Sequence, residues 1–149
     1  MTSIKTLGLC LALTLPAGAA RAQNPAPTPE TAALALSFPD LKTKTGPIMI
    51  VVFDSAQGWA SGKPAHVAMA SAADAEPAAR IEGLKPGLYA ARVFQDVNSD
   101  GKLGANPFGL PTEPYGFSNA AQANMGPPSF EEASFTLIAG DNAQIITLK

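Results

Sequence analysis

Short, strand-length runs of apolar residues separated by turn residues dominate the sequence from residue 31 onward, and helical periodicity is nearly absent. Such a pattern is typical of an all-β domain, because side chains on a strand alternate between two faces. The continuous apolar run Pro47–Phe53 is typical of a central strand buried on both faces. In all, we expect strands over residues 31–38, 47–53, 66–70, 78–81, 88–95, 133–138 and 143–148. About seven short strands joined by Gly- and Pro-containing turns predict a single antiparallel β-sandwich.

Three connections between these runs carry further expectations. The Ala-rich segment 55–77 is the weakest part of the strand pattern and has room for a helical turn. Gly140-Asp141-Asn142 reads as a hairpin turn between the last two strands. Residues 96–129 form a connection with no clear strand, and loops of that length in a compact domain are usually functional or separately structured. We therefore expect one long ordered loop.

The N-terminal segment has the features of a secretory signal peptide over residues 1–22. Lys5 supplies a positive start, a short apolar region follows, and Ala20-Arg21-Ala22 fits the pattern for cleavage before Gln23. The apolar run is too short to span a bilayer as a helix. A Pro-rich tether over residues 23–30 then leads to the sandwich domain, residues 31–149. The expected location is therefore periplasmic or secreted, with no membrane span in the mature protein.

Cleavage at this site would change both the cysteine content and the charge. Cys10, the only cysteine, lies in the expected signal peptide, so the mature chain would hold no thiol and no disulfide. Eight basic residues would remain against twelve acidic ones, with no basic cluster. Nucleic acid is therefore not an expected partner, because its recognition needs a positive surface.

One motif in the long connection has the spacing of a calcium-binding loop. Asp96, Asn98 and Asp100 follow the strand at alternate positions, and Gly101 allows a sharp turn. The backbone carbonyl of Lys102 would supply a further oxygen. These residues are candidate ligands for Ca²⁺, which prefers six to eight oxygen atoms.

The match to a calcium loop is incomplete. Pro107 stands where a bidentate Glu is expected, and Gly104 offers no side chain. Glu113 would complete the site by folding back, and Asn106 would offer an amide oxygen. The alternative is that the polar side chains bond the backbone and stabilise a tight turn without metal.

The second part of the connection, residues 108–119, combines glycines, prolines and aromatic residues. We consider Tyr115, Phe117 and Asn119 a candidate ligand surface. The alternative is that the aromatic rings cover one end of the sandwich, since aromatic residues act mainly through burial.

Four stretches resemble a known bacterial exported family, domain of unknown function 2141: V-F-D-S-A-Q-G-W (52–59), G-L-Y-A-A-R-V-F-Q-D-V-N-S-D-G-K-L (87–103), G-L-P-T-E-P-Y-G-F-S-N (109–119) and G-P-P-S-F-E-E-A-S-F (126–135). The resemblance implies export and a small sandwich of the immunoglobulin- or prealbumin-like kind, similar to carboxypeptidase-regulatory-like domains. It implies no activity. Gly104 departs from the family pattern, where an acidic residue is common, and this weakens the calcium interpretation.

The residues needed for most enzyme classes are missing from the sequence. His66 is the only histidine, and we expect it to be an exposed strand residue. No nucleophile elbow or phosphate-binding loop is present. Arg92 is expected to face solvent or to pair with a carboxylate. We therefore expect a non-enzymatic binding or accessory module of the cell envelope that uses residues 96–119 and recognises an envelope protein or a small ligand. The alternatives are an envelope hydrolase that uses carboxylates, and a structural subunit that packs on a membrane protein.

Overall fold

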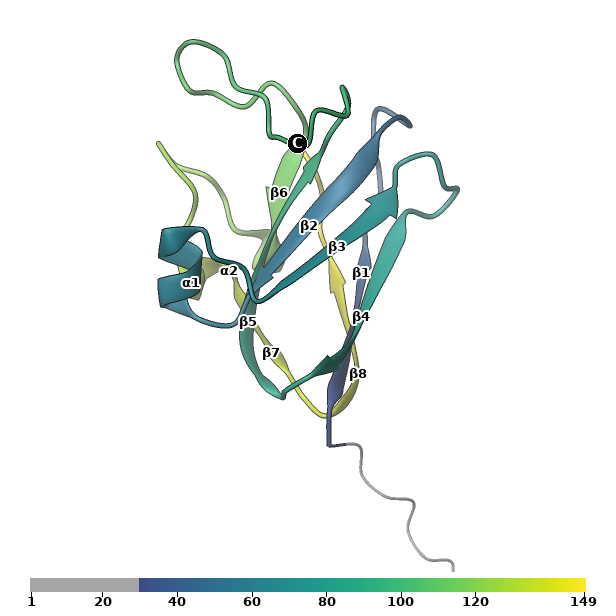
Figure 1. The fold of residues 1–149 in the computed structure, drawn as a ribbon, viewed down its shortest axis with the longest axis vertical. Helices are drawn as coiled ribbons and strands as arrows, with labels where there is room; N and C mark the ends of the chain where they lie inside the picture. The colour runs from purple at the N-terminus through teal and green to yellow at the C-terminus, as the bar shows by residue number, and fades with distance from the viewer. Residues whose placement is uncertain (1–29) are drawn as a thin grey trace, which may run out of the picture.

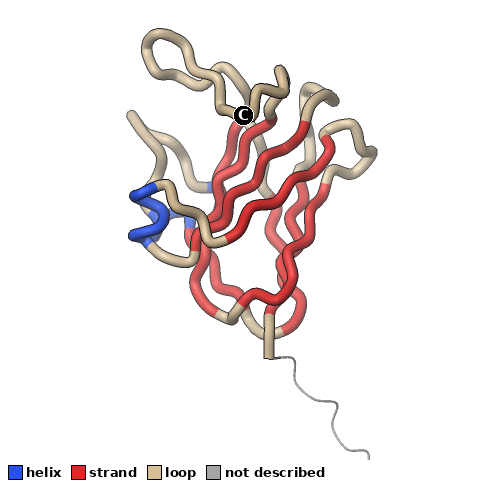
Figure 2. The backbone as a smooth tube through the Cα atoms, viewed as in Figure 1, coloured by secondary structure: helices blue, strands red, loops and turns tan. Residues whose placement is uncertain are grey.

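The computed structural model describes residues 30–149, which form a β-sandwich of eight strands in two sheets (Figures 1 and 2). The expected signal peptide and nearly all of the Pro-rich tether lie outside the described residues. The predicted all-β sandwich is confirmed.

The smaller sheet has three strands in the order β4-β1-β8. They are β1 (Ala32–Ser37), β4 (Ala78–Leu84) and β8 (Gly140–Ile145). β4 pairs with β1 in the antiparallel sense, whereas β8 runs parallel to β1. The expectation of a purely antiparallel sandwich is therefore wrong for this pair.

The larger sheet has five strands. They are β2 (Pro47–Phe53), β3 (His66–Ser71), β5 (Gly87–Gln95), β6 (Tyr115–Phe117) and β7 (Ser134–Leu137). β2 lies between β3 and β5, and both pairings are antiparallel. The other edge of β5 is shared, because its first half pairs with β7 and its second half with β6.

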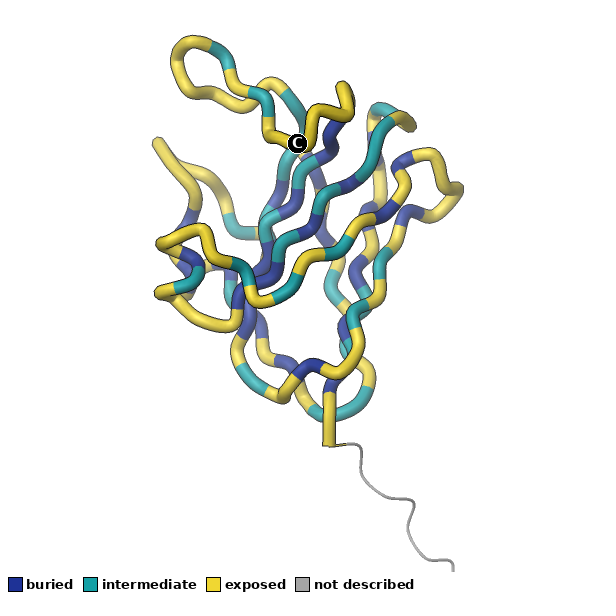
Figure 3. The backbone as a smooth tube through the Cα atoms, in the orientation of Figure 1, coloured by how far each residue is buried: buried dark blue, intermediate teal, exposed yellow. Residues whose placement is uncertain are grey.

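The main core fills the space between the two sheets. Alternate residues of each strand point into it, which Figure 3 shows as a repeat of buried and less buried positions along the strands. Leu34 and Leu36 of β1 face Ile48 and Ile50 of β2, and all four are fully buried. The alternation predicted for β1 and β5 is confirmed by this burial.

The predicted hairpin at residues 140–142 is wrong. Gly140, Asp141 and Asn142 lie inside β8, which belongs to the smaller sheet, while β7 pairs with β5 in the larger sheet. The chain therefore crosses between the sheets at residues 138–139. The Asn142 side chain holds this corner by accepting from the Ile138 N–H at 3.0 Å and donating to the Ile138 carbonyl at 2.8 Å.

Two short helices cover part of the outer face of the larger sheet (Figure 1). The helix α1 (Ala56–Ser61) confirms the helical turn expected in the Ala-rich segment, and Ser55 caps it by accepting from the Gly58 N–H. The helix α2 (Phe130–Ala133) begins with a capping box formed by Ser129 and Glu132. A short 3-10 turn (Ser118–Ala120) follows β6. The helices leave the other part of this face open, so β2 is not fully buried on both faces as expected.

Candidate functional site

The open part of the outer face carries apolar side chains in neighbouring positions on three strands, β2, β5 and β6. Strand pairing sets Arg92 between Val51 and Phe117. Two residues further along β5, Phe94 lies between Met49 and Tyr115. Residues opposite one another in a sheet lie close enough for their side chains to touch. This face is therefore an apolar surface with one cation in its middle.

A groove of about 750 Å³ lies over this surface. Its floor includes Val51, Arg92, Phe94, Tyr115 and Phe117. Its walls come from two loops, residues 103–111 and 123–127, which project from the same side of the molecule in Figure 1. A cavity of this size, mostly apolar with few polar groups, is typical of sites for small molecules.

The first wall is a narrow loop that closes on itself through backbone bonds. The Asn106 N–H donates to the Leu110 carbonyl at 2.9 Å, and the Thr112 N–H donates to the Gly104 carbonyl at 2.8 Å. The Asn106 side chain accepts from the N–H groups of Phe108 and Leu110. These bonds leave Phe108 88% exposed and Leu110 62% exposed.

The second wall presents Met125 at its tip. Met125 is fully exposed and has a φ of 56°, in the left-handed region that a residue with a side chain rarely adopts. The loop is anchored below, where the Trp59 Nε1–H donates to the buried Pro128 carbonyl at 2.9 Å. An apolar side chain is thus held in water at a strained backbone position.

An aromatic cluster lies beside the groove, under the two helices. The Trp59 ring packs against Phe53, Phe117 and Phe130, with centroid distances of 5.2, 6.1 and 6.3 Å. Arg92 stacks on this cluster, with its guanidinium carbon 4.0 Å from the Trp59 ring centroid and 5.1 Å from that of Phe53. Such cation–π contacts hold the guanidinium plane in place.

Arg92 therefore differs from its expected role. It is half-buried, and it pairs with no carboxylate of the described residues. Its Nη2 donates to the Trp59 carbonyl at 2.8 Å, while its buried Nε has no hydrogen-bond partner in residues 30–149. Burial lowers the pKa of Arg92 from its usual value, because the charged form loses hydration.

The predicted metal residues form a self-bonded turn. Asp96 is buried, and its carboxylate accepts from the N–H groups of Asp100 at 3.0 Å and Gly101 at 2.8 Å. The Asn98 side chain also accepts from the Asp100 N–H, and Asp100 accepts from the Lys102 N–H. These are the contacts of the metal-free alternative.

Glu113 does fold back toward this turn, as the calcium interpretation required. Its Oε1 accepts from the Val97 N–H at 2.8 Å, and its Oε2 accepts from the Gly104 N–H at 2.8 Å. The carboxylate thus joins the two ends of the loop. Within the described part of the chain, no three acidic, histidine or cysteine side chains meet in a way that could hold a metal ion. Calcium binding by Asp96, Asn98, Asp100, Lys102 and Glu113 stays a prediction.

The candidate ligand surface is divided by the structure. Tyr115 and Phe117 both line the groove, and their rings meet edge to face at 5.8 Å. Asn119 does not line it. Its side chain donates to the Glu132 carbonyl at 2.9 Å, so it links the 3-10 turn to α2.

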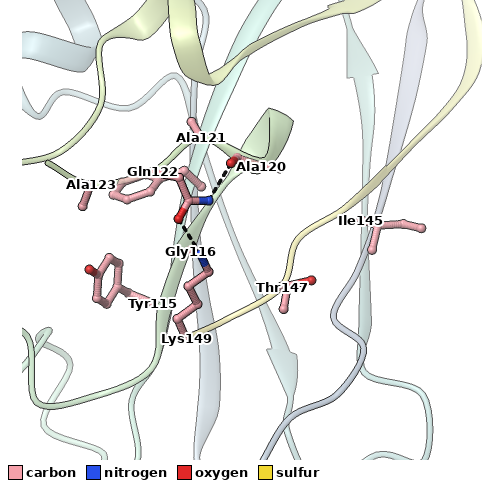
Figure 4. Close-up of a pocket in the computed structure, with 10 residues that line it drawn as sticks. Tyr115, Gly116, Ala120, Ala121, Gln122, Ala123, Ile145, Thr147 and Lys149 are labelled. Carbon is pink, nitrogen blue, oxygen red and sulfur yellow. Dashed lines mark hydrogen bonds between the residues drawn. The ribbon is translucent and has the colours of Figure 1, made fainter.

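A smaller hollow of about 390 Å³ lies beyond β6 (Figure 4). The Tyr115 ring lies on one side of it, with Thr147 and Ile145 on the other. The Gln122 side chain donates to the Ala120 carbonyl and accepts from Lys149 Nζ. This bridge crosses the hollow, so the larger groove is the better candidate site.

Sequence reasoning missed most of the groove. Val51 lies inside a continuous apolar run that predicts a strand buried on both faces, so the run does not indicate that this side chain lines a groove. Met125 gave no local signal. Arg92 occupies the strand face opposite to Ala91 and Val93, and this alternation indicated only that it points away from the core. His66, which we expected to be exposed, is half-buried at the start of β3.

Comparison with known proteins identifies the family. The sequence model of a family described as "Uncharacterized protein conserved in bacteria (DUF2141)" matches residues 37–146. The chain belongs to this family. The match covers β2 to β8 completely and therefore includes the groove and both of its walls.

Other comparisons add little to this family assignment. No curated protein matches the chain. Among solved structures, a chain described as "Pilus-presented adhesin, Spy0125 (Cpa), Cys426Ala mutant" is similar at 14% identity and a TM-score of 0.24. That match covers 82% of this chain and 27% of the adhesin, so this chain spans about a quarter of that protein's length. In residues 30–149, neither helix has the length and apolar character needed to cross a membrane.

Proposed function

We propose that this protein is an exported, non-enzymatic binding module of the bacterial cell envelope, and that its binding site is the apolar groove on the larger sheet. This moves the centre of the expected site from the Asp96 turn to the sheet face that Tyr115 and Phe117 share with β2 and β5. The Asp96 turn then acts as a support for the first wall.

The observation that carries the proposal is the exposure of large apolar side chains around one groove. Phe108 is 88% exposed and Leu110 62% exposed, and Met125 stands opposite them on the second wall. Exposed apolar patches in folded proteins commonly mark interaction sites, because their contact with water is unfavourable. The hydrogen bonds inside the first wall fix the backbone of the loop before any ligand binds, which lowers the cost of ordering it.

The chemistry of the lining supports binding in preference to catalysis. Among residues 30–149, those that line the groove include no Asp, Glu, His, Lys or Cys, and Arg92 is their only charged side chain. General acid–base catalysis needs a group that can exchange a proton near neutral pH, which an arginine does not do. A hydrolase that uses the carboxylates of the loop would have to act outside this groove.

Binding of an uncharged apolar fluorophore tests the proposal directly. We expect N-phenyl-1-naphthylamine to bind the purified protein with increased fluorescence. Leu110→Ser should weaken this binding about tenfold, since it removes an apolar wall. Ile138→Ser is the matched control, because Ile138 is 64% exposed but lies outside the groove. Absence of binding to the wild type, or equal weakening by both variants, would refute the groove as the binding site.

The alternatives give different results. A structural subunit should be insoluble without its partner, and a hydrolase should turn over substrate in a way that the Leu110 substitution leaves unchanged. A binding module should be soluble, should bind the fluorophore and should show no turnover.

Export is tested by the N-terminus of the protein recovered outside the cytoplasm. We expect this protein to begin at Gln23. Ala22→Arg should block cleavage, since a large charged residue does not fit the small-residue cleavage pattern. Ala26→Arg, four residues downstream, should be processed normally. Recovery of the uncleaved wild-type chain in the cytoplasm would contradict export.

A further inference from the structure

We propose that the groove takes a long-chain aliphatic monocarboxylate, with the hydrocarbon chain between the two walls and the carboxylate on Arg92. This inference rests on the proposed function and specifies the ligand of the same groove.

The charge distribution of the groove indicates the headgroup. Within the described part of the chain, Arg92 is the only charged side chain in the lining, and the other lining side chains are apolar apart from the Tyr115 hydroxyl. Both ion pairs found in the described residues belong to Arg80, on the other sheet. A cation in an apolar groove without a carboxylate partner is complementary to a ligand that is apolar with a single negative charge.

The position of Arg92 suits it to bind a carboxylate. The Nη2 bond to the Trp59 carbonyl and the stacking on Trp59 and Phe53 fix the guanidinium plane. A fixed guanidinium loses little further freedom when it binds, and its planar fork matches the two oxygens of a carboxylate. The Nε is buried out of contact with solvent, so a bound carboxylate would meet Nη1 and the second N–H of Nη2.

The floor of the groove favours a hydrocarbon chain over a peptide. It lies on β2, β5 and β6, whose backbone groups already pair with one another across the strands. An extended peptide recognised by strand addition needs free backbone groups at a sheet edge. A hydrocarbon chain has no polar groups to satisfy, so it can lie on the side chains of this face without loss of hydrogen bonds.

A series of ligands that differ only in the headgroup tests the inference. Dodecanoate, dodecanol and dodecyltrimethylammonium would each displace N-phenyl-1-naphthylamine from the wild-type protein, below their micellar concentrations. We expect dodecanoate to bind at least tenfold more tightly than dodecanol, and the cation to bind most weakly. Raised salt should reduce the preference for dodecanoate and leave dodecanol unchanged.

Variants of the two arginines separate the headgroup contact from the fold. In Arg92→Gln, the preference for dodecanoate over dodecanol should fall to about one, whatever the change in fluorophore affinity. Arg92→Lys should keep part of the preference, because it keeps the charge and loses the fork. Arg80→Gln should behave like the wild type.

Each result decides between the two proposals. If the wild type binds dodecanoate and dodecanol equally while the fluorophore binds, the carboxylate inference is refuted and the groove proposal stands. If Arg92→Gln keeps the full preference, Arg92 is not the headgroup contact. If the fluorophore does not bind the wild type, both proposals fail. If Arg92→Gln does not fold, the ligand series on the wild type still decides.

Discussion

Asp96 shows how one buried carboxylate can organise a turn. It is 2% exposed, and its two oxygens accept from the N–H groups of Asp100 and Gly101. In Asp96→Asn, the amide NH₂ would face one of these N–H donors, so one bond is lost and two donors oppose each other. We expect the free energy of unfolding to fall by about 1–3 kcal/mol, measured by urea denaturation.

The control for this substitution is Asp74→Asn. Asp74 is exposed in the turn between β3 and β4, and its side chain makes no hydrogen bond with the described residues, so its substitution should change stability little. The same measurement tests the calcium prediction. Under the metal-free alternative, Ca²⁺ should leave stability unchanged, and no three acidic side chains of the described residues meet at this turn. A site filled at 100 times its dissociation constant would add about 2.7 kcal/mol, and such a gain would restore the calcium interpretation.

Met125 combines backbone strain with an exposed apolar side chain. Its φ of 56° costs a residue with a Cβ about 1 kcal/mol relative to glycine. We therefore expect Met125→Gly to keep or slightly raise the melting temperature while it weakens fluorophore binding, because glycine relieves the strain and removes an apolar wall. Met125→Ala keeps the Cβ and serves as the control, since it should weaken binding without any gain in stability. A loss of stability in the glycine variant together with unchanged binding would show that Met125 packs in the fold and not on a ligand.

At the scale of an element, the short strand β6 depends on a close approach to the end of the chain. The N–H of Tyr115 donates to the Lys149 carbonyl, and that of Lys149 donates to the Tyr115 carbonyl. A Cβ on the neighbouring Gly116 would lie 2.6 Å from the Thr147 carbonyl oxygen and 3.0 Å from Ile146 Cγ2. Gly116→Ala should therefore push the two segments apart and destabilise the protein by about 1–3 kcal/mol in thermal or urea unfolding.

Gly126 gives the matched control for this strand prediction. A Cβ on Gly126 meets no atom within 4 Å, so Gly126→Ala should leave stability nearly unchanged. Equal stability of Gly116→Ala and Gly126→Ala would show that β6 and the last residues separate without cost.

Seven of the eight strands were predictable from sequence, whereas β6 (Tyr115–Phe117) lies in the connection that was expected to hold no strand. The pairing of the strands was only partly predictable. Alternation located β1 and β5, because one face of each strand lies in the core. The turn residues at 140–142 suggested a hairpin, yet Gly140 begins a strand of the other sheet. Turn residues indicate that the chain changes direction. Tertiary contacts decide which strand the next segment pairs with.

At the scale of the whole molecule, the candidate site follows from strand order more than from any motif. Tyr115 and Phe117 were predictable as a ligand surface because they stand close together in the sequence. Arg92 joins them only because β6 pairs with β5, and Val51 joins them only because β2 pairs on the other side. These contacts connect residues distant in sequence, so no single stretch of the chain indicated the groove.

The same strands connect the groove to the core and predict how the protein unfolds. Ile50 and Val52 of β2 lie in the core between the sheets, whereas Phe53 of the same strand lies in the aromatic cluster around Trp59. Residues of β5 also lie in both clusters. Because both clusters share these strands, we expect them to unfold together. Trp59 is the only tryptophan, so its fluorescence reports the outer cluster alone, while far-ultraviolet circular dichroism reports the sheets.

The two signals should therefore change at the same denaturant concentration. Phe130→Ala removes a large side chain from the outer cluster only, at a cost of about 3–5 kcal/mol. It should shift both transitions by the same amount, and Ile138→Ser, an exposed position on neither cluster, should shift neither. If the fluorescence transition alone moved to lower denaturant, the helices α1 and α2 would be an independent layer. The aromatic support of Arg92 could then open while the sandwich stayed folded.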